Sequence, residues 1–369
     1  MRKLIKTASI LFLTAVLVAV LLLAWAWQSV HWYAPVEAVK IECTDSATPW
    51  KKGEPLKILS YNVQFMAGRN YYFFYDGGPD RRPSYESINW TIEQVAELIR
   101  KENPDIVLLQ EVTDKEDSRT HYRDQVTELQ QALARDAYPC SADAHYWKAR
   151  FVPHHKILGA VSMKLTTLSR HPLDNASRHQ LPIADSFFLK RRFYFQRAIL
   201  ETRLADDHGN SAAILNTHFD AWTGGSDLSA QQVEALQRKV TALENRNIPW
   251  IVGGDFNALP PDGGIQYRNL QYQKIDVYNS ESELTPLFEN YGAIPSLNAL
   301  TSKTAPEWYT LYPNVPGANK PDRTIDYFFY SSDWRAEKSA VLRGKALHIS
   351  DHLPLITSFT LKTNSSAFD

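Results

Sequence analysis

The sequence predicts an α/β domain that follows an apolar N-terminal helix. The chain has 369 residues, of which 44% are hydrophobic and 22% are charged, so it can bury a large core. Short apolar runs with β-branched residues alternate with segments whose apolar residues recur at helical spacing. After the N-terminus, no linker, charge block or low-complexity tract divides the sequence. We therefore expect one catalytic domain of the α/β class.

The N-terminal segment, residues 1–27, is predicted to be a transmembrane anchor. Residues 8–27 carry no charge, and about 20 apolar residues are enough to cross the hydrocarbon core of a bilayer. Arg2, Lys3 and Lys6 precede this run, which places the N-terminus in the cytoplasm and the rest of the chain outside, in the periplasm or the extracellular space. Residues 24–26 also resemble a small-x-small cleavage site, so a cleaved signal peptide and a secreted protein are the alternative.

Residues 28–55 are expected to form a stalk with little periodicity, and residues 56–362 the catalytic domain. Cys43 and Cys140 suit an oxidising compartment, but the sequence leaves open whether they form a disulfide or remain two buried thiols. The formal net charge of −1 argues against a protein that coats nucleic acid, which would usually be basic. It does not argue against an enzyme that acts on phosphates through a metal.

The first half of the domain shows a strand, a helix and a second strand. The first strand begins at Leu56 and ends in Asn62, and a long aromatic loop follows. A helix is predicted to open at Thr91 and to stop before Pro104. The second strand, residues 106–109, is fully apolar and delivers Glu111 at its end. Burying a lone carboxylate is costly unless a cation pairs with it, and a divalent metal would do so.

The second half repeats this order of elements. After a helix predicted at about 124–135 and a segment that is hard to interpret, strands at 198–204 and 212–217 lead to His218. A helix capped by Ser229 connects to the strand that begins at Ile251. We expect two similar halves whose strand ends face one cleft.

Polar residues also follow the last predicted strands. The strand from Ile251 breaks at two glycines and presents Asp255 and Asn257, which suit water activation and phosphate orientation but are also common turn residues. A strand at 324–330 carries Asp326, and the adjacent Asp351 and His352 precede the final strand. Residues 261–321 are expected to be lid, specificity or surface loops.

Six short motifs in one order, SYNVQ, LLQEV, NTHF, GGDFN, TIDYFF and SDHLP, resemble the endonuclease/exonuclease/phosphatase superfamily, which includes DNase I. The resemblance extends over about residues 56–360. It implies a four-layer α/β/β/α sandwich of two mainly antiparallel sheets flanked by helices.

The resemblance also implies roles for the polar residues. It assigns a Mg²⁺ or Mn²⁺ ion to Asn62, Glu111 and Asp351, and oxygen ligands of this kind are those that Mg²⁺ prefers. It implies that His352 contacts the scissile phosphate or transfers a proton, that Asp326 orients it, and that Asp255 positions or deprotonates the attacking water. Asn257 and His218 would bind the non-bridging phosphate oxygens.

The implied activity is metal-dependent hydrolysis of a phosphodiester or phosphomonoester by in-line attack of water. Export favours three substrate classes, namely extracellular nucleic acid, phospholipid head groups and small soluble phosphoesters. The aromatic run 71–75 and the basic aromatic segment 187–195 could contact a membrane or stack bases, but core packing with a solvated basic edge is the favoured interpretation. The alternative function is an inactive, membrane-tethered binding protein on the same scaffold. A monomer is expected.

Overall fold

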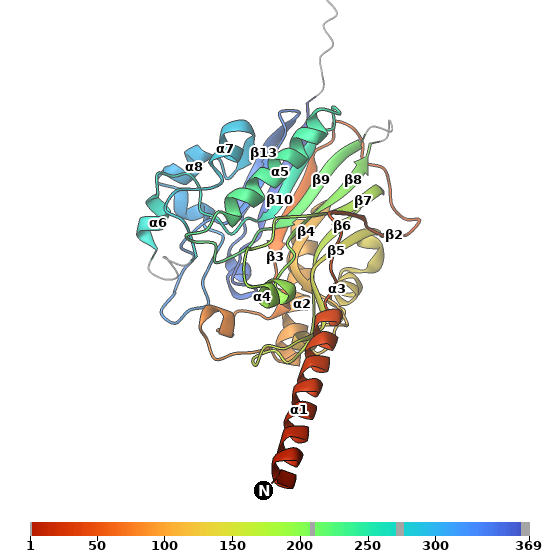
Figure 1. The fold of residues 1–369 in the computed structure, drawn as a ribbon. Helices are drawn as coiled ribbons and strands as arrows, with labels where there is room; N and C mark the ends of the chain where they lie inside the picture. Colours follow the sequence, from red (N-terminus) through yellow and green to blue (C-terminus); the bar gives the residue numbers. More distant parts are fainter. Residues whose placement is uncertain (1, 207–210, 271–276, 363–369) are drawn as a thin grey trace, which may run out of the picture.

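A computed structural model describes residues 2–206, 211–270 and 277–362 of the chain. Within these residues, two seven-stranded sheets pack face to face and helices cover their outer faces, so the predicted four-layer sandwich is confirmed (Figure 1). The first sheet has the order β13 (Trp334–Val341), β14 (Leu355–Leu361), β3 (Leu56–Asn62), β4 (Ile106–Thr113), β6 (Gly159–Ser169), β5 (Cys140–Val152) and β2 (Ile41–Cys43). The second has the order β1 (Val36–Ala38), β7 (Leu173–Gln180), β8 (Ala198–Ala205), β9 (Ser211–His218), β10 (Trp250–Asp255), β12 (Asp326–Tyr330) and β11 (Gly292–Ile294).

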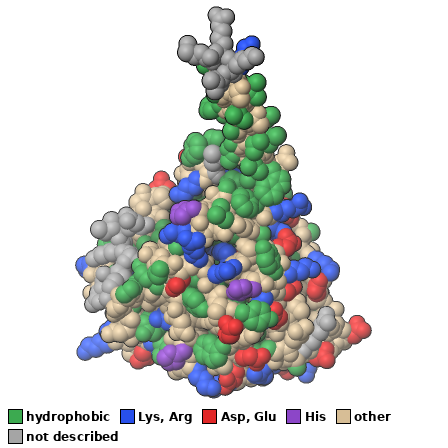
Figure 2. Space-filling view, turned by 90° about the horizontal axis from the view of Figure 1, so that it is seen from below, with side chains coloured by type: hydrophobic (Ala, Val, Ile, Leu, Met, Phe, Trp, Pro, Cys, Tyr) green, Lys and Arg blue, Asp and Glu red, His purple; other side chains and the backbone are tan. Residues whose placement is uncertain are grey.

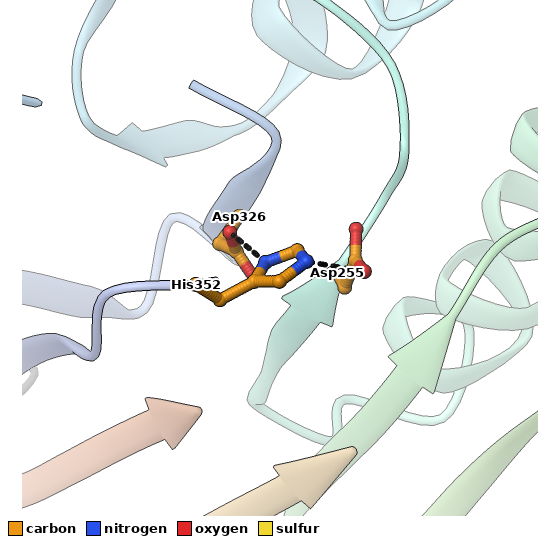
Figure 3. Close-up of side chains that lie close together, drawn as sticks. All are labelled: Asp255, Asp326 and His352. Atoms are coloured by element: carbon orange, nitrogen blue, oxygen red, sulfur yellow. Dashed lines mark hydrogen bonds and ion pairs between the residues drawn. The ribbon is translucent and has the colours of Figure 1, made fainter. Parts of the chain in front are cut away.

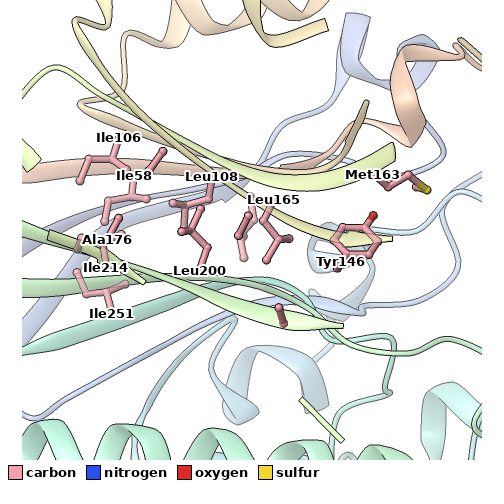
Figure 4. Packing of buried hydrophobic residues seen from close by; sticks show 14 of the residues in the cluster. Ile58, Ile106, Leu108, Tyr146, Met163, Leu165, Ala176, Leu200, Ile214 and Ile251 are labelled. Carbon is pink, nitrogen blue, oxygen red and sulfur yellow. The ribbon is translucent and has the colours of Figure 1, made fainter. Parts of the chain in front are cut away.

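The inner faces of the two sheets form the central core (Figure 4). Ile58 and Leu108 from the first sheet lie opposite Leu200 and Ile214 from the second, and all four side chains are fully buried. The alternation of apolar residues along these strands explains the arrangement, because side chains one residue apart point to opposite faces of a sheet.

Separate helices cover each outer face. Helices α2 (Tyr85–Glu102) and α3 (Gln125–Leu133) share an apolar cluster with the outer face of the first sheet. Helices α5 (Leu228–Glu244), α7 (Thr285–Asn290) and α8 (Leu297–Thr301) do the same for the second sheet. Two further short helices, α4 (Phe188–Phe193) and α6 (Ile265–Asn269), lie in the connecting loops.

Helix α2 begins earlier than predicted. Ser84 is its N-cap, and the Ser84 hydroxyl oxygen accepts a hydrogen bond from the backbone N–H of Ser87 at 3.1 Å. The predicted start, Thr91, instead lies buried in the second turn, after Ile88, which is already buried in the core. The capping-box pattern at Thr91 therefore did not mark the start of the helix. A helix capped by Ser84 includes Ile88 as well and so has a longer apolar stripe.

The N-terminal helix α1 (Arg2–Ser29) projects from the domain (Figure 1). Its segment Ile5–Ser29 is, among the described residues, the one helix long and apolar enough to cross a membrane, and a signal sequence would have the same features. Side chains along the projecting part are exposed, whereas Ala26 and Val30 at its end are buried against the domain.

Residues 28–55 differ from the expected stalk, because they pair with the sheets. Strand β1 extends the second sheet beside β7, and β2 extends the first beside β5. Cys43 and Cys140 form a disulfide that links β2 to β5. Edge strands this short carry too weak a period to be recognised in the sequence, so the segment resembled a stalk.

Two parallel strand pairs bring four predicted site residues to one edge. Strands β3 and β4 are parallel, and so are β9 and β10, with Asp255 directly opposite His218. Parallel neighbours end at the same side of a sheet, so Asn62, His218 and Asp255, the last residues of β3, β9 and β10, lie at a common rim with Glu111 near the end of β4.

The glycines of β10 are required by packing. A Cβ at Gly253 would lie 2.4 Å from the ring of Phe328, and one at Gly254 would lie 2.0 Å from the carbonyl oxygen of Thr217 on β9. Backbone and ring atoms therefore occupy the space that any side chain at these two positions would need.

Candidate active site

Asn62 joins the ends of the two sheets. Its side-chain amide donates to Glu111 Oε1 at 3.3 Å and to Asp255 Oδ2 at 3.0 Å, and its Oδ1 accepts from the backbone N–H of Gln64 at 3.0 Å. The residue is 1% exposed, so the amide is held by these contacts. One neutral side chain thus holds two carboxylates from different sheets close together.

Glu111 reaches the rim through an irregularity in β4. The pairing of β4 with β6 shifts register between Leu109 and Val112, and Glu111 adopts a left-handed φ of 60°. Such a bulge re-aims a side chain away from the regular alternation of a strand. The Glu111 carboxylate therefore faces the cavity next to Asn62 instead of solvent.

His352 lies between two aspartates (Figure 3). Its Nδ1 is 2.9 Å from Asp326 Oδ2, and its Nε2 is 3.6 Å from Asp255 Oδ2. Asp255 and Asp326 are directly opposite residues on the antiparallel strands β10 and β12, which explains how both reach one imidazole. The Asp326 contact fixes the ring orientation and favours a proton on Nδ1.

His218 and Asn257 complete the wall beside Asp255. His218 Nε2 lies 3.3 Å from Asp255 Oδ2, and its Nδ1 makes no hydrogen bond within the described residues. The Asn257 backbone N–H donates to Asp255 Oδ1 at 2.9 Å, and its side-chain amide donates to the Phe219 carbonyl at 3.1 Å. Asp255 is therefore fixed from several sides.

Asp351 lies at the same rim and is held by a glutamine. Gln64 Nε2 donates to Asp351 Oδ2 at 2.8 Å, and Gln64 Oε1 accepts from the Asn314 side-chain amide at 3.2 Å. Asp351 and Glu111 are close enough for their charges to interact. The structure thus brings all eight sequence-predicted site residues to one place, although the role of each remains a prediction.

Burial dominates the electrostatics of the rim. It raises the pKa of Asp255 to about 7, against the opposing charge of His352. Burial and the negative charge of Asp351 also raise the pKa of Glu111. Burial and the nearby Arg197 lower the pKa of His218 well below its usual value. For His352, burial would lower the pKa, but the charges of Asp326 and Asp255 outweigh it and raise the pKa well above normal.

Two overlapping groups could hold a cation. Asp255, Asp326 and His352 each place a ligand atom within 4.8 Å of the others. A cation there would compete with the hydrogen bond between His352 and Asp326. Glu111 fits better, because among the described residues its only hydrogen-bond partner is the neutral Asn62 amide, and His218 Nε2 is 3.9 Å away. The Glu111 carboxylate, whose side chain is 20% exposed, therefore lacks a strong cationic contact. With Asn62 and Asp351 it forms an oxygen-rich set of the kind that suits Mg²⁺ or Mn²⁺.

The rim opens into a cavity of about 680 Å³. The catalytic candidates Glu111, His218, Asp255, Asn257, Asp351 and His352 line it together with many apolar side chains. Leu23 of α1 also lines this cavity. The volume is sufficient for a ligand much larger than inorganic phosphate.

The sequence did not single out two residues of the cavity. Gln64 positions Asp351, and its place two residues after Asn62 in the SYNVQ motif was the available signal. Arg197 is 3% exposed, and its Nε lies 3.5 Å from Asp220 Oδ1. Its Nη1 makes no hydrogen bond among the described residues. Arg197 closely follows the basic aromatic segment, so the sequence did not distinguish this buried arginine from the exposed basic residues before it.

Comparisons with known proteins agree with this geometry. Nocturnin of Rattus norvegicus is 27% identical over 323 residues, which cover 83% of this chain and 66% of that protein. The endonuclease/exonuclease/phosphatase structure from Beutenbergia cavernae has a TM-score of 0.57 at 19% identity, covering 85% of this chain and 73% of that one. The human Nocturnin catalytic domain with bound sulfate has a TM-score of 0.53 at 19% identity, covering 88% of this chain and 97% of that one.

At these identities the solved structures show the fold, and the family follows from the sequence match. A model of the Endonuclease/Exonuclease/phosphatase family matches residues 59–352, which include the eight predicted site residues. The chain therefore belongs to the Endonuclease/Exonuclease/phosphatase family, a family of hydrolases that act on phosphoester bonds.

Proposed function

We propose that the protein is a membrane-anchored, exported, metal-dependent phosphoesterase that hydrolyses its substrate by in-line attack of water. The observation that carries the proposal is the position of Asp255. Its carboxylate lies 3.0 Å from the Asn62 amide and 3.6 Å from His352 Nε2 in a cavity with room for a substrate. No covalent enzyme intermediate is needed.

Asn62, Glu111 and Asp351 would hold the Mg²⁺ or Mn²⁺ ion. When bound, the ion supplies positive charge that stabilises the charge developing on the phosphate oxygens. The Asn62 amide that contacts Glu111 and the Gln64 contact that fixes Asp351 preorganise this set.

Asp255 acts as the base. Because burial raises its pKa to about 7, a substantial fraction is ionised at neutral pH and can accept a proton from water. The Asn62 amide and the Asn257 backbone N–H hold its two oxygens, so the accepting atom is oriented before substrate binds.

His218, Asn257 and His352 act on the phosphate. His218 is neutral, because burial lowers its pKa, and with its proton on Nε2 it can donate to a non-bridging oxygen. Asn257 has a second amide proton besides the one given to Phe219. His352, oriented by Asp326, is placed to protonate the leaving oxygen.

The location outside the cytoplasm rests on α1 and on the disulfide. The basic residues before the apolar run orient the helix with its N-terminus inside, and Cys43 bonded to Cys140 suits an oxidising compartment. Protease added outside the plasma membrane, to intact cells or to spheroplasts whose outer membrane has been removed, should digest the domain and not the N-terminus if this topology holds. Digestion only after the plasma membrane is opened would contradict it.

Hydrolysis of bis-p-nitrophenyl phosphate and p-nitrophenyl phosphate tests the activity. We expect the full chain to release p-nitrophenol with Mg²⁺ or Mn²⁺, to lose the activity with EDTA or with Glu111→Gln, and to keep a small, measurable part of it with His352→Ala. Lys148→Ala is the matched control, because this residue pairs with the exposed Glu116 and neither side chain lines the cavity. If wild type and both site variants were equally inactive across a panel of plasmid DNA, sphingomyelin, inositol phosphates and nucleotides, an inactive binding protein would be the better description.

A further inference from the structure

The end of α1 is fastened directly to the catalytic domain. The Ser29 hydroxyl donates to the Phe151 carbonyl at 3.0 Å, and the His31 backbone N–H donates to the Lys148 carbonyl at 2.9 Å. Arg192 on α4 donates to the carbonyls of Trp27 and Val30, each at 3.1 Å. These contacts hold the domain in one orientation relative to the helix, which a free stalk would not do.

The catalytic cavity lies at the level where α1 would leave the bilayer. If the hydrocarbon core begins near Ile5, about 20 residues at 1.5 Å each span about 30 Å and reach Trp25. Leu23 lies just inside that boundary and lines the same cavity as Glu111 and His352. The part of the cavity wall that Leu23 forms therefore lies at the outer edge of the hydrocarbon core.

Exposed apolar side chains lie at the end of α1, at the start of α4 and next to the cavity residue Ile157. We call Trp25, Trp27, Leu158, Phe187 and Phe188 the apolar collar; all except Trp27 are more than half exposed. Trp27 packs on Phe188 with ring centroids 5.9 Å apart, which joins the helix end to α4. Figure 2, viewed from the helix end, shows hydrophobic side chains gathered at the base of α1. Aromatic residues at this depth are typical of a membrane interface.

Basic residues accompany the collar. Lys190 and Arg191 on α4 are exposed beside Phe188, and Lys190 also lines the cavity. Lysine and arginine next to an apolar surface attract the anionic head groups of a bilayer. The same face therefore offers both an apolar surface and positive charge.

The cavity itself has an apolar wall beside the catalytic rim. Phe74, Trp147, Ile157, Phe193 and Trp222 line it. A small, fully hydrophilic phosphoester would leave these side chains without a partner, whereas an amphiphile would cover them.

We infer that the substrate is a phosphoester lipid of the bilayer that holds α1, drawn from the outer leaflet with its phosphate at the rim and its chains against Leu23 and the collar. The inference rests on the proposed phosphoesterase activity and names its substrate class. Water adds its oxygen to phosphorus, the ester P–O bond breaks, and the leaving alkoxide receives a proton. The products are a phosphate monoester or inorganic phosphate and an alcohol.

The test uses the full chain reconstituted in vesicles. The vesicles contain phosphatidylethanolamine, phosphatidylglycerol, phosphatidylcholine, phosphatidic acid, sphingomyelin and an isoprenyl phosphate, and ³¹P NMR follows each phosphoester. Dihexanoyl lipids with the same head groups, dissolved as monomers, form the second arm, and bis-p-nitrophenyl phosphate forms the third. We expect at least one vesicle lipid to be cleaved faster than its dihexanoyl counterpart.

Two variants of α1 test whether the faster cleavage of vesicle lipids depends on Leu23. Leu23→Asn places an amide at the cavity, and Leu22→Asn places one on a neighbouring, exposed position that does not line it. Because an amide at this position would weaken the apolar contact with the lipid chains, and only part of Leu23 is covered, the ratio of the vesicle rate to the soluble rate should fall roughly fivefold for Leu23→Asn. The ratio for Leu22→Asn should equal that of wild type.

The outcomes separate the two proposals. Cleavage of bis-p-nitrophenyl phosphate without cleavage of any vesicle lipid would overturn the lipid substrate and leave the phosphoesterase intact. Equal rates on vesicle and dihexanoyl lipids, or equal ratios for the two leucine variants, would also overturn it. Inactivity towards all three arms would overturn both.

Discussion

Replacing Asp326 with asparagine tests whether this residue acts on the reaction through His352. Asp326 has a side chain that is 3% exposed and accepts from His352 Nδ1 at 2.9 Å. Its backbone N–H is held by the Thr310 hydroxyl at 3.2 Å, so the strand should keep its position in the variant. Asparagine has the same shape but no charge, so the change removes the ionic part of the contact.

The expected loss follows from the strength of that contact. A hydrogen bond to a charged group is worth about 1.5–3 kcal/mol, and about 1.4 kcal/mol is a factor of ten, so kcat/KM should fall roughly 10- to 150-fold. The loss should fall mainly on kcat, because Asp326 touches His352 and not the substrate. KM should change less than about twofold.

Steady-state hydrolysis of bis-p-nitrophenyl phosphate measures both constants. Asp333→Asn is the matched control, because Asp333 accepts from the Ser331 hydroxyl beyond the opposite end of β12. In the background of His352→Ala, Asp326→Asn should cause no further loss, since its effect passes through the imidazole. Full activity of Asp326→Asn, or an equal further loss in the double variant, would refute the reasoning.

Three further predictions concern stability, each measured by urea unfolding in detergent. Because the disulfide joins residues 97 positions apart, replacing Cys43 and Cys140 with serine should cost about 4–5 kcal/mol, and an unchanged midpoint would contradict this. Burial would raise the pKa of Glu201, but its ionic contacts with His179, Lys239 and Arg203 outweigh burial and lower the pKa from 4.5 to about 2. The ionised form of Glu201 is thus favoured in the folded state, so its contribution to the free energy of unfolding is present above pH 4.5 and is lost as the pH falls towards 2, by at most about 3 kcal/mol. Glu201→Gln should reduce this dependence of stability on pH. The same acid unfolding profile for the variant and for wild type would contradict the prediction. Gly254→Ala should cost at least about 2 kcal/mol, because its Cβ would meet the Thr217 carbonyl oxygen at 2.0 Å, and wild-type stability would show that β9 can move aside.

The strands that carry the site were predictable because each is an apolar run with a polar end. The runs before Asn62, Glu111 and Asp255 are short and contain β-branched residues, and their apolar side chains are fully buried. Such runs indicate a strand independently of the segments around them. The sandwich of two sheets was not readable from these runs, since the pairing of distant strands leaves no local trace. The resemblance to the family supplied it.

What the sequence concealed depends on long-range contacts. Residues 28–55 looked irregular because their partners, β5 and β7, are about 100 residues or more away along the chain. The bulge that turns Glu111 towards Asn62 is a mismatch between β4 and β6, which neither strand encodes by itself. The aromatic segment around α4 depends on the hydrogen bond from Arg192 to the carbonyl of Trp27, which is 165 residues away along the chain, so its sequence did not indicate its position.

Hydrolysis in ¹⁸O-labelled water tests the central claim, that Asn62, Glu111 and Asp351 hold a metal beside an oriented water-activating carboxylate. Mass spectrometry of the phosphate product from bis-p-nitrophenyl phosphate should show one ¹⁸O atom on phosphorus with Mg²⁺ or Mn²⁺. No labelled product should form with EDTA or with Glu111→Gln. Equal labelled product from wild type and from Glu111→Gln, or formation that continues without a metal, would contradict the account.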